Sequence, residues 1–237
     1  MTRDRQLSSA FSLCRGIMRL EAVVPNFKAN TTFGPIDFYE FQGDSWVVLF
    51  SHPADFTPVC TTELGRMATH DQEFKKRNVK LIALSCDKLQ DHKDWVDDIK
   101  SYCPDLCGNF PFPIIADENR DLAVLLDLIS EDDRNNPEAA MTVRGLYIIG
   151  PDHKLKLAMV YPFSTGRNVD EVIRCVDSLQ LVARKKVIAT PMNWTPGTKV
   201  MILPHVKDED LPTLFPKGVE KVSMPSGKSY VRTTTDY

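Results

Sequence analysis

The 237-residue chain lacks several features that would assign it to a specialised class of protein. No apolar run approaches the roughly 18 residues that a membrane-spanning helix needs. Basic and acidic residues nearly balance, with 29 Lys and Arg against 32 Asp and Glu, and they form no basic stripe. Internal repeats and low-complexity tracts are also absent. We therefore expect an ordinary globular protein with neither a transmembrane segment nor a nucleic-acid partner.

Cysteines are few for a chain of this length, and disulfide stabilisation is not expected. The chain has six, at positions 14, 60, 86, 103, 107 and 175. A chain this long buries enough apolar surface without disulfides, so a reducing compartment, the cytoplasm, is the expected location. The first residues contain Arg3, Arg5 and Arg15 against Asp4, without the continuous apolar segment of a secretory signal. Mitochondrial targeting is the alternative.

Cys60 lies where a predicted strand, the apolar stretch 46–50, leads into a predicted helix. Thr57 is a suitable N-cap and Pro58 a suitable first helical residue, which places Cys60 in the first helical turn. Unpaired N–H groups and the helix dipole favour a negative charge there, so they stabilise the nucleophilic thiolate. A small buried cysteine beside a capping threonine would fit the same pattern without any chemistry.

The spacing Pro-x-x-x-Thr-x-x-Cys, formed by Pro53, Thr57 and Cys60, resembles the peroxidatic motif of the peroxiredoxins. Further matches occur in the segments 79–85, 111–115, 161–162 with 165–168, and 216–219. With its long C-terminal tail, the chain resembles the one-cysteine, peroxiredoxin-6 type. The resemblance implies an α/β fold with a thioredoxin-like core, a central mixed sheet flanked by helices, and a loop-rich C-terminal extension.

Sequence patterns agree with an alternation of strands and helices. Strands are predicted over 36–41, 45–50, 79–85, 146–149 and 155–160, and helices after residue 58 and over 89–99, 120–129 and 169–182. The dipeptide Ser226-Gly227 predicts a hairpin turn. We expect a flexible extension over 1–18, a thioredoxin-like peroxidase domain over 19–186 and a C-terminal extension over 187–237, where six prolines occur.

The resemblance implies three catalytic residues. Cys60 corresponds to the nucleophile that attacks the peroxide, and Thr57 to the residue that orients the two oxygens together with the backbone N–H of Cys60. Arg144, matched through the segment 142–145, corresponds to a cation near the developing charge. An arginine stays charged at any working pH.

Four further residues are expected to support the site. Pro53 would shield the thiolate, and Glu63 would hold Arg144 through a charge-assisted hydrogen bond. His52 would line the same pocket, and Arg167 matches a second arginine near the family's site. Alternatively, Glu63 compensates the helix dipole and His52 is a packed loop histidine.

The implied function is that of a thiol-dependent peroxidase in antioxidant defence and redox homeostasis. It would reduce hydrogen peroxide and organic hydroperoxides, those of phospholipids included, through a sulfenic acid on Cys60. Relatives with two cysteines resolve this intermediate with a cysteine in a Val-Cys-Pro run, whereas this chain has Ala189-Thr190-Pro191 and no cysteine after Cys175. We therefore expect an external thiol, such as glutathione, delivered directly or by a glutathione transferase, and no bound cofactor.

Several alternatives remain open. The resemblance implies a homodimer, and such a dimer could act as a peroxide sensor or a chaperone-like binding protein without efficient turnover. A disulfide exchanger is disfavoured because residues 61–63 contain no second cysteine. Cys103 and Cys107 could resolve Cys60 or pair with each other, whereas a metal site there is not expected without a companion Cys/His pair. Cys86 and Cys175 are interpreted as packing residues.

Phospholipase activity, which the resembled class sometimes carries, is expected to be weak or absent. The family assigns it to a serine in a Gly-Asp-Ser-Trp-Gly run with a histidine and an aspartate. Here Ser45 and Asp152 match, but Val47 replaces the last glycine and Tyr39 occupies the histidine position. The usual general base for a serine nucleophile is therefore missing.

Overall fold

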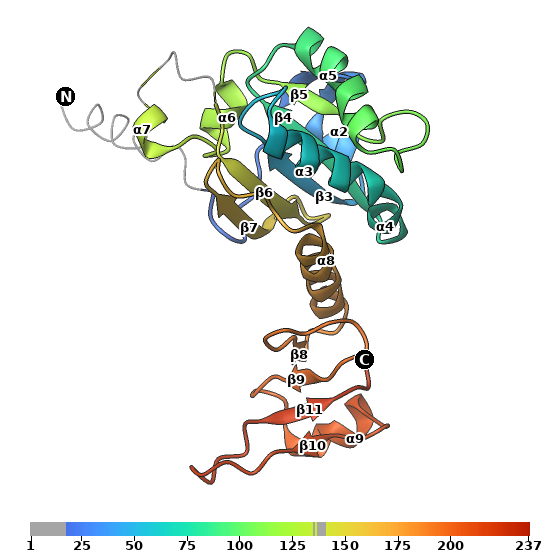
Figure 1. The fold of residues 1–237 in the computed structure, drawn as a ribbon. Coiled ribbons are helices and arrows are strands. Elements are labelled where there is room, and N and C mark those ends of the chain that lie inside the picture. The colour runs from blue at the N-terminus through green and yellow to red at the C-terminus, as the bar shows by residue number, and fades with distance from the viewer. Residues whose placement is uncertain (1–17, 135, 137–140) are drawn as a thin grey trace, which may run out of the picture. The chain divides into compact units, whose positions relative to one another are not determined.

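The computed structural model describes residues 18–134, 136 and 141–237, so the predicted N-terminal extension lies outside it except for Met18. The chain divides into two compact units between Val169 and Asp170 (Figure 1). The domain borders expected at residues 18 and 186 stay predictions. None of the described helices is both long and apolar enough to cross a membrane.

A seven-stranded mixed sheet forms the centre of the first unit (Figure 1). In spatial order its strands are β2 (Gly34–Asp37), β1 (Lys28–Thr31), β5 (Ile114–Ala116), β4 (Val79–Ser85), β3 (Trp46–Ser51), β6 (Arg144–Ile149) and β7 (Leu155–Tyr161). Strands β3, β4 and β5 are parallel, and every other neighbouring pair is antiparallel. The predicted mixed sheet and the β6–β7 hairpin are confirmed.

Both faces of this sheet are buried. On β3, Val47 and Leu49 belong to a core cluster with Tyr147, while Val48 and Phe50 on the opposite face are also fully buried. The described helices of the unit are α2 (Phe38–Gln42), α3 (Pro58–Thr69), α4 (Asp71–Lys76), α5 (Leu89–Tyr102), α6 (Asp121–Leu125) and α7 (Glu131–Arg134). Burial on both faces explains why β3 and β4 have continuous rather than alternating apolar sequences.

Helices α3 and α5 pack closely at Gly65. A Cβ at this position would overlap with the sulfur of Cys103, which follows α5. Trp95 and Ile99 on α5 are fully buried, as the predicted amphipathic pattern requires. The helix that carries Cys60 is therefore held against its neighbour by close contact as well as by the sheet.

Two predicted elements differ from the structure. The segment 36–41 was expected to be a strand, but the chain leaves β2 at Asp37, whose carboxylate caps helix α2 by accepting from the amides of Tyr39 and Glu40. The helix expected over 120–129 ends at Leu125, and Asp127 then adopts a φ of 56°. A capping side chain and a left-handed residue, respectively, override the apolar patterns.

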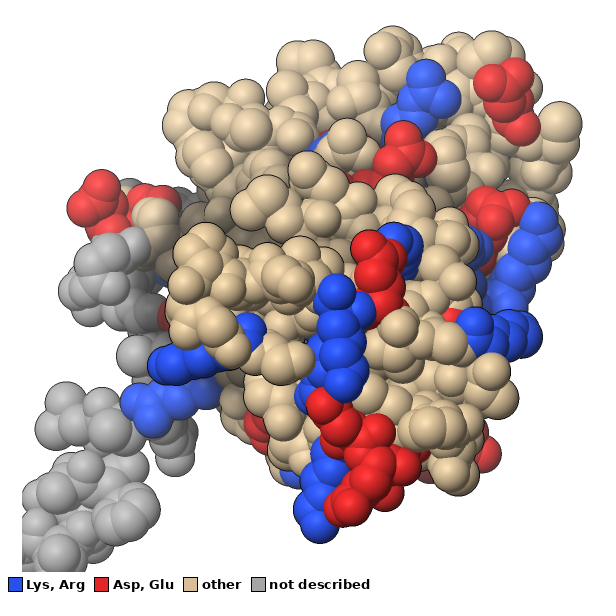
Figure 2. Space-filling model, turned by 90° about the horizontal axis from the view of Figure 1, so that it is seen from below, with Lys and Arg blue, Asp and Glu red and all other residues tan. Residues whose placement is uncertain are grey.

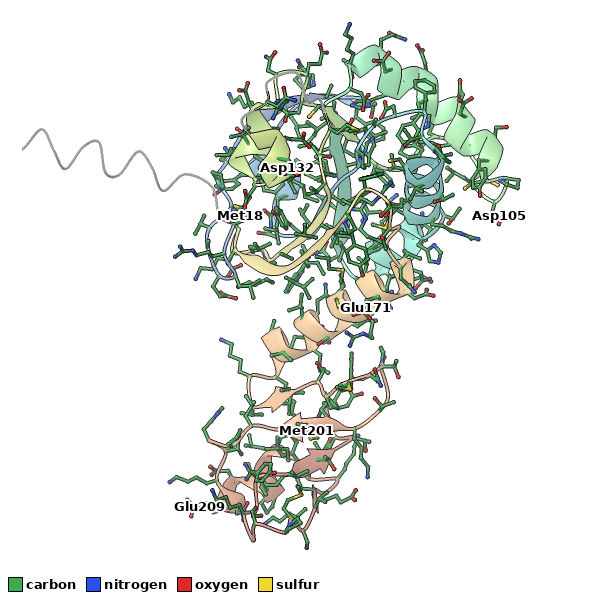
Figure 3. The ribbon with its side chains drawn as sticks, turned by 60° about the vertical axis from the view of Figure 1, so that its left-hand side comes forward. Met18, Asp105, Asp132, Glu171, Met201 and Glu209 are labelled. Carbon is green, nitrogen blue, oxygen red and sulfur yellow. The ribbon has the colours of Figure 1, made fainter. Side chains whose placement is uncertain are left out.

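The second unit begins with helix α8 (Val169–Arg184) and continues in a small antiparallel sheet. The strands of this sheet, in spatial order, are β10 (Glu220–Lys221), β11 (Arg232–Thr234), β9 (Val200–Ile202) and β8 (Ile188–Ala189). A short 3-10 turn (Asp208–Asp210) leads into α9 (Leu211–Leu214). Figure 3 marks Glu171 on α8 and Met201 on β9. This region was expected to be loop-rich, and its strands are indeed only two or three residues long.

Charged side chains of both signs alternate on the face shown in Figure 2. Blue and red atoms lie beside one another there, and no continuous basic patch forms on that face. This view agrees with the near-zero net charge of the sequence.

Candidate active site

Cys60 lies in the first turn of α3 and is fully buried. Strand β3 ends at Ser51, a six-residue loop follows, and α3 begins at Pro58, the residue predicted to be its first. Thr57 occupies the N-cap position, but its hydroxyl does not cap the helix and donates instead to the carbonyl of Ala54 at 2.8 Å. The amides of the first turn therefore lack a side-chain cap, which leaves their positive potential available to the sulfur.

Sheet register brings Arg144 to Cys60 although 84 residues separate them. Strand β6 pairs antiparallel with β3, and Leu146 lies opposite Phe50, so the first residue of β6 lies at the end of β3 that leads to α3. The Nη1 group of Arg144 donates to Cys60 Sγ at 3.3 Å and to Glu63 Oε2 at 2.7 Å. Its Nε and Nη2 groups donate to the carbonyl of Phe163. These contacts fix a buried cation against the sulfur.

Glu63 joins two arginines. Its Oε1 accepts from the amide and the Nε of Arg167 at 2.7 and 2.8 Å, and its Oε2 accepts from Arg167 Nη2 as well as from Arg144. Burial alone would raise the pKa of Glu63, but the hydrogen bonds and charge of Arg167, together with Arg144, bring it below its ordinary value. The hydrogen bond expected between Glu63 and Arg144 is present, and Arg167 belongs to the same network.

Arg167 is itself held on three sides. Its Nη1 donates to the carbonyl of Gly145 at 2.7 Å, and its guanidinium lies 5.4 Å from the centre of the Phe50 ring. The cluster of Arg144, Glu63 and Arg167 therefore contains two cations and one anion, and its net charge is positive. This net positive charge lies beside the sulfur of Cys60, where it can stabilise negative charge that develops during a reaction.

His52 and Pro53 are buried, but the hydrogen bonds of His52 do not involve Arg144, Glu63 or Arg167. Its Nε2 lies 2.7 Å from Asp55 Oδ1, and within the described parts of the chain no hydrogen bond joins it to Cys60. Asp55 also contacts His92 on α5, at 2.5 Å from Nδ1. The structure thus places His52 in a separate cluster with Asp55 and His92. One potential metal-binding nitrogen or oxygen from each of these side chains lies within 4.8 Å of the other two.

Three of the other described cysteines lie in surroundings that favour the neutral thiol. Burial, with a contribution from Asp117, raises the pKa of Cys86 to about 12, and burial with Glu171 raises that of Cys175 to about 11. Burial also raises the pKa of Cys103. Cys107 is exposed in the loop marked by Asp105 in Figure 3. No described disulfide joins these residues to Cys60, which is a free thiol.

Sequence reasoning missed three features of the site. The carbonyl of Phe163 anchors Arg144, but a backbone acceptor leaves no signal in the identity of its residue. Asp55 lies within the peroxidatic motif, but the sequence pattern assigned it no role. Its burial, which requires hydrogen-bond partners for the carboxylate, is visible only in the structure. His92 lies 37 residues further along the chain, and only the packing of α5 brings it to Asp55.

Chemically, the arrangement combines a sulfur nucleophile, a fixed guanidinium and free amide donors. Such a set stabilises negative charge on sulfur before a reaction and on oxygen during it. The hydroxyl of Thr57 donates its single hydrogen to the carbonyl of Ala54. The lone pairs of this hydroxyl can therefore accept a hydrogen bond from a bound molecule.

Comparisons with known proteins agree with this chemistry. The model of the AhpC/TSA family matches residues 20–158, and that of the C-terminal domain of 1-Cys peroxiredoxin matches residues 178–215. Human peroxiredoxin-6 is 53% identical over 220 residues, which cover 92% of this chain and 98% of the relative.

Two known structures are also similar. A cysteine-to-serine variant of peroxiredoxin 6 from Arenicola marina has 51% identity and a TM-score of 0.88, covering 94% of this chain and 99% of its own. A yeast mitochondrial 1-Cys peroxiredoxin, described with thiol resolution through glutathione and thioredoxin systems, has 42% identity and a TM-score of 0.82. The match covers 92% of this chain and 99% of the yeast chain.

Proposed function

The chain belongs to the peroxiredoxin family of thiol-dependent peroxidases, and from this premise we propose that Cys60 is the residue that attacks the peroxide. The contact that carries the proposal is the 3.3 Å hydrogen bond from Arg144 to the sulfur of a buried residue in a first helical turn. The comparisons do not favour the chaperone-like alternative.

In the proposed first step, the thiolate of Cys60 attacks the terminal oxygen of a hydroperoxide. An S–O bond forms and the O–O bond breaks, so sulfur is oxidised to a sulfenic acid while the other oxygen leaves as hydroxide or alkoxide and takes a proton from solvent to become water or an alcohol. Arg144 and the first-turn amides stabilise the charge that moves from sulfur to the leaving oxygen. The lone pairs of Thr57 accept the peroxide O–H, which orients the O–O bond toward the sulfur.

We propose that an external thiol completes the cycle. It attacks the sulfenic sulfur, releases water and forms a mixed disulfide, which a second thiol then breaks. This proposal is supported by the surroundings of Cys103, whose sulfur packs against Gly65 on α3 and whose pKa burial raises. Glutathione, free or delivered by a glutathione transferase, is the proposed reductant, and the cytoplasm the proposed location, with mitochondria as the alternative.

The test is stopped-flow oxidation of the fully reduced protein by hydrogen peroxide, followed by mass analysis of every cysteine. We expect rapid oxidation at Cys60 alone and no disulfide between Cys60 and another cysteine. The matched control is Cys107→Ser, which removes an exposed thiol and should leave the rate unchanged.

Three results would contradict the proposal. Oxidation of Cys60 no faster than that of a free thiol would show that Cys60 is not a peroxidatic residue. Rapid oxidation that persists in Cys60→Ser would show that another cysteine reacts with the peroxide. A disulfide from Cys60 to Cys103 or Cys107 would show internal resolution and exclude the one-cysteine cycle.

We also propose that the protein is a homodimer, and the free edge of the main sheet supports this assembly. Strand β7 ends the strand order; the segment 21–22 covers its outer edge at Leu155, and the rest of that edge pairs with no described strand. Val160 on this strand is 61% exposed, and an apolar edge strand favours pairing with a second copy. A sedimenting mass of one chain at micromolar concentration would exclude the dimer.

The structure gives Ser45 no described histidine partner. Its hydroxyl donates to Asn78 Oδ1 at 2.9 Å, while the hydroxyl of Tyr39 donates to the carbonyl of Val24. His153 stacks on Tyr39 at 3.8 Å between ring centres, but its Nδ1 contacts Gln42. We propose that the serine is structural.

We predict that ester release from phospholipid vesicles is at background level and does not change in Ser45→Ala. The reason is that no general base contacts the serine, so its hydroxyl is not activated. Fatty-acid release should be measured by mass spectrometry beside Cys60→Ser. Release that Ser45→Ala abolishes and Cys60→Ser retains would establish a second active site.

A further inference from the structure

His52, Asp55 and His92 form a buried cluster that the peroxidase chemistry does not require. His92 Nε2 lies 3.1 Å from the carbonyl oxygen of Ile115 on β5, and His92 Nδ1 lies 2.5 Å from Asp55 Oδ2. His52 Nε2 lies 2.7 Å from Asp55 Oδ1. These three contacts connect α5, β5 and the loop that precedes Cys60.

The contacts need more protons than neutral side chains can supply. A carbonyl oxygen only accepts, so His92 Nε2 must carry a hydrogen. The contacts of His92 Nδ1 and His52 Nε2 with Asp55 need one hydrogen each. Two neutral imidazoles and a carboxylate contain two hydrogens, whereas three are required, so the cluster holds one additional proton.

The surroundings indicate where that proton resides. Burial lowers the pKa of His52, whose Nδ1 has no partner among the described residues, so His52 is neutral. Burial alone would raise the pKa of Asp55, but the hydrogen bonds from His52 and His92 bring it below its ordinary value. The additional proton therefore lies in the 2.5 Å contact between His92 Nδ1 and Asp55 Oδ2.

A proton fits these distances better than a metal ion does. Ligands of a tetrahedral zinc ion, with bonds near 2.0–2.2 Å, lie roughly 3.3 Å from one another, whereas the two N–O distances are 2.5 and 2.7 Å. The second ring nitrogen of His92 donates its N–H to a carbonyl, as metal-bound histidines do, but the same contact also orients the ring toward Asp55.

Asp55 adjoins a strained residue. Phe56 has a φ of 53°, in the left-handed region that is unfavourable for a residue with a side chain, and its side chain is 54% exposed. Strain at a site persists only where the surrounding contacts hold it. Before Phe56 in the chain, Asp55 is anchored by both histidines and by its amide, which donates to Asp87. After Phe56, the hydroxyl of Thr57 donates to the carbonyl of Ala54.

We propose that His92 is a positioning residue of the peroxidase site, which holds Asp55 through the proton between them and thereby keeps the loop from His52 to Thr57 in its strained, reactive shape. The inference rests on the proposed role of Cys60. The charged or titratable groups that face His92 and Asp55 are His52 on the same loop and Asp87 after β4. None of these groups touches the sulfur, so His92 acts through the placement of Thr57 and Cys60.

The first test is spectroscopic. A proton shared over 2.5 Å between nitrogen and oxygen should give a ¹H resonance far downfield of the backbone amides in the reduced full-length protein. We expect this resonance in the wild type and in His70→Gln, because the ring of His70 hydrogen-bonds to Arg66 and Thr69 and to no member of the His52–Asp55–His92 cluster among the described residues. It should be absent from His92→Phe and Asp55→Asn. Its absence from the wild type would overturn the proposal.

The second test compares rates of Cys60 oxidation by stopped flow, well below the unfolding temperature of each variant. His92→Phe should be slower by about 10- to 100-fold, because small displacements of reacting groups cost this much. His92→Gln retains one donor toward Asp55 and should lose less, whereas His70→Gln should match the wild type.

The outcomes separate the two proposals. A slow wild-type protein would reject the role of Cys60 itself. A fast wild type with an equally fast His92→Phe would reject only the positioning role. If a chelator slowed the wild type, or if added zinc removed the downfield resonance at one equivalent, the cluster would be a metal site and this inference would be wrong.

Discussion

Replacement of Arg144 by leucine should slow the reaction of Cys60 with hydrogen peroxide by about 100- to 1,000-fold, the usual effect of removing a charge-stabilising donor. Arg144 is 3% exposed and its Nη1 donates to the sulfur at 3.3 Å, so its charge acts through little intervening solvent. Leucine removes both the cation and the donor. The second-order rate constant should be measured by stopped-flow fluorescence over several peroxide concentrations.

Two variants make this prediction specific. Arg144→Lys keeps the charge, but a single ammonium cannot reach Cys60, Glu63 and the carbonyl of Phe163 together, so an intermediate rate is expected. Arg66→Leu removes an exposed cation from the same helix and should react like the wild type. If Arg144→Leu folds and its rate constant stays within threefold of the wild type, Arg144 does not stabilise the transition state.

Replacement of Glu63 by glutamine should lower both stability and activity. The carboxylate is 6% exposed and accepts from two buried guanidinium groups, whereas the amide of glutamine would direct N–H donors toward one of them. Breaking a buried ion pair costs about 3–5 kcal/mol, so the melting temperature should fall by roughly 10 °C. The rate of Cys60 oxidation should fall about 10- to 100-fold because Arg144 loses its fixed orientation.

The stability that Glu63→Gln loses should decrease as the pH is lowered. The pKa of Glu63 is lowered in the folded protein, so the carboxylate contributes its stabilisation above its unfolded value of 4.5 and loses it as the pH falls through the folded value. The difference in unfolding free energy between wild type and Glu63→Gln should therefore be largest near neutral pH and shrink under acid conditions.

A matched substitution provides the control for this pH dependence. Glu73→Gln alters a partly exposed glutamate that pairs with Lys76 and Arg77, and it should change stability much less than Glu63→Gln does. Urea titrations at a series of pH values measure both differences. A Glu63→Gln loss that stayed constant down to pH 3, or that only equalled that of Glu73→Gln, would reject the buried ion-pair assignment.

The turn that carries Cys60 could be predicted from local sequence, because the residues that specify it are neighbours in the chain. The residues from Pro53 to Glu63 carry the loop, the helix start and the nucleophile together. Strands such as β4 were also predictable, since burial on both faces leaves a continuous apolar run. The helix at 38–42 was mistaken for a strand because a single capping carboxylate, that of Asp37, decided its conformation.

The electrostatic surroundings of the sulfur depended on tertiary structure. Arg144 could be placed at Cys60 only through resemblance to a family, and the physical reason for its position is the antiparallel register of β6 against β3. The Phe163 carbonyl that fixes this arginine follows β7, which pairs with β6 in turn. Register depends on side-chain packing across the whole sheet, which no short segment encodes.

The sequence by itself determined that a cysteine would begin a helix after a buried strand, since a proline, a threonine and apolar spacing specify that turn locally. Only the tertiary structure decided which charges surround it and what holds the loop in place. Glu63 could have been a simple dipole-compensating residue, and His92 had no local signal at all. Glu63 contacts Arg144 and Arg167, and His92 contacts Asp55, because the packed sheet and α5 bring these distant segments together.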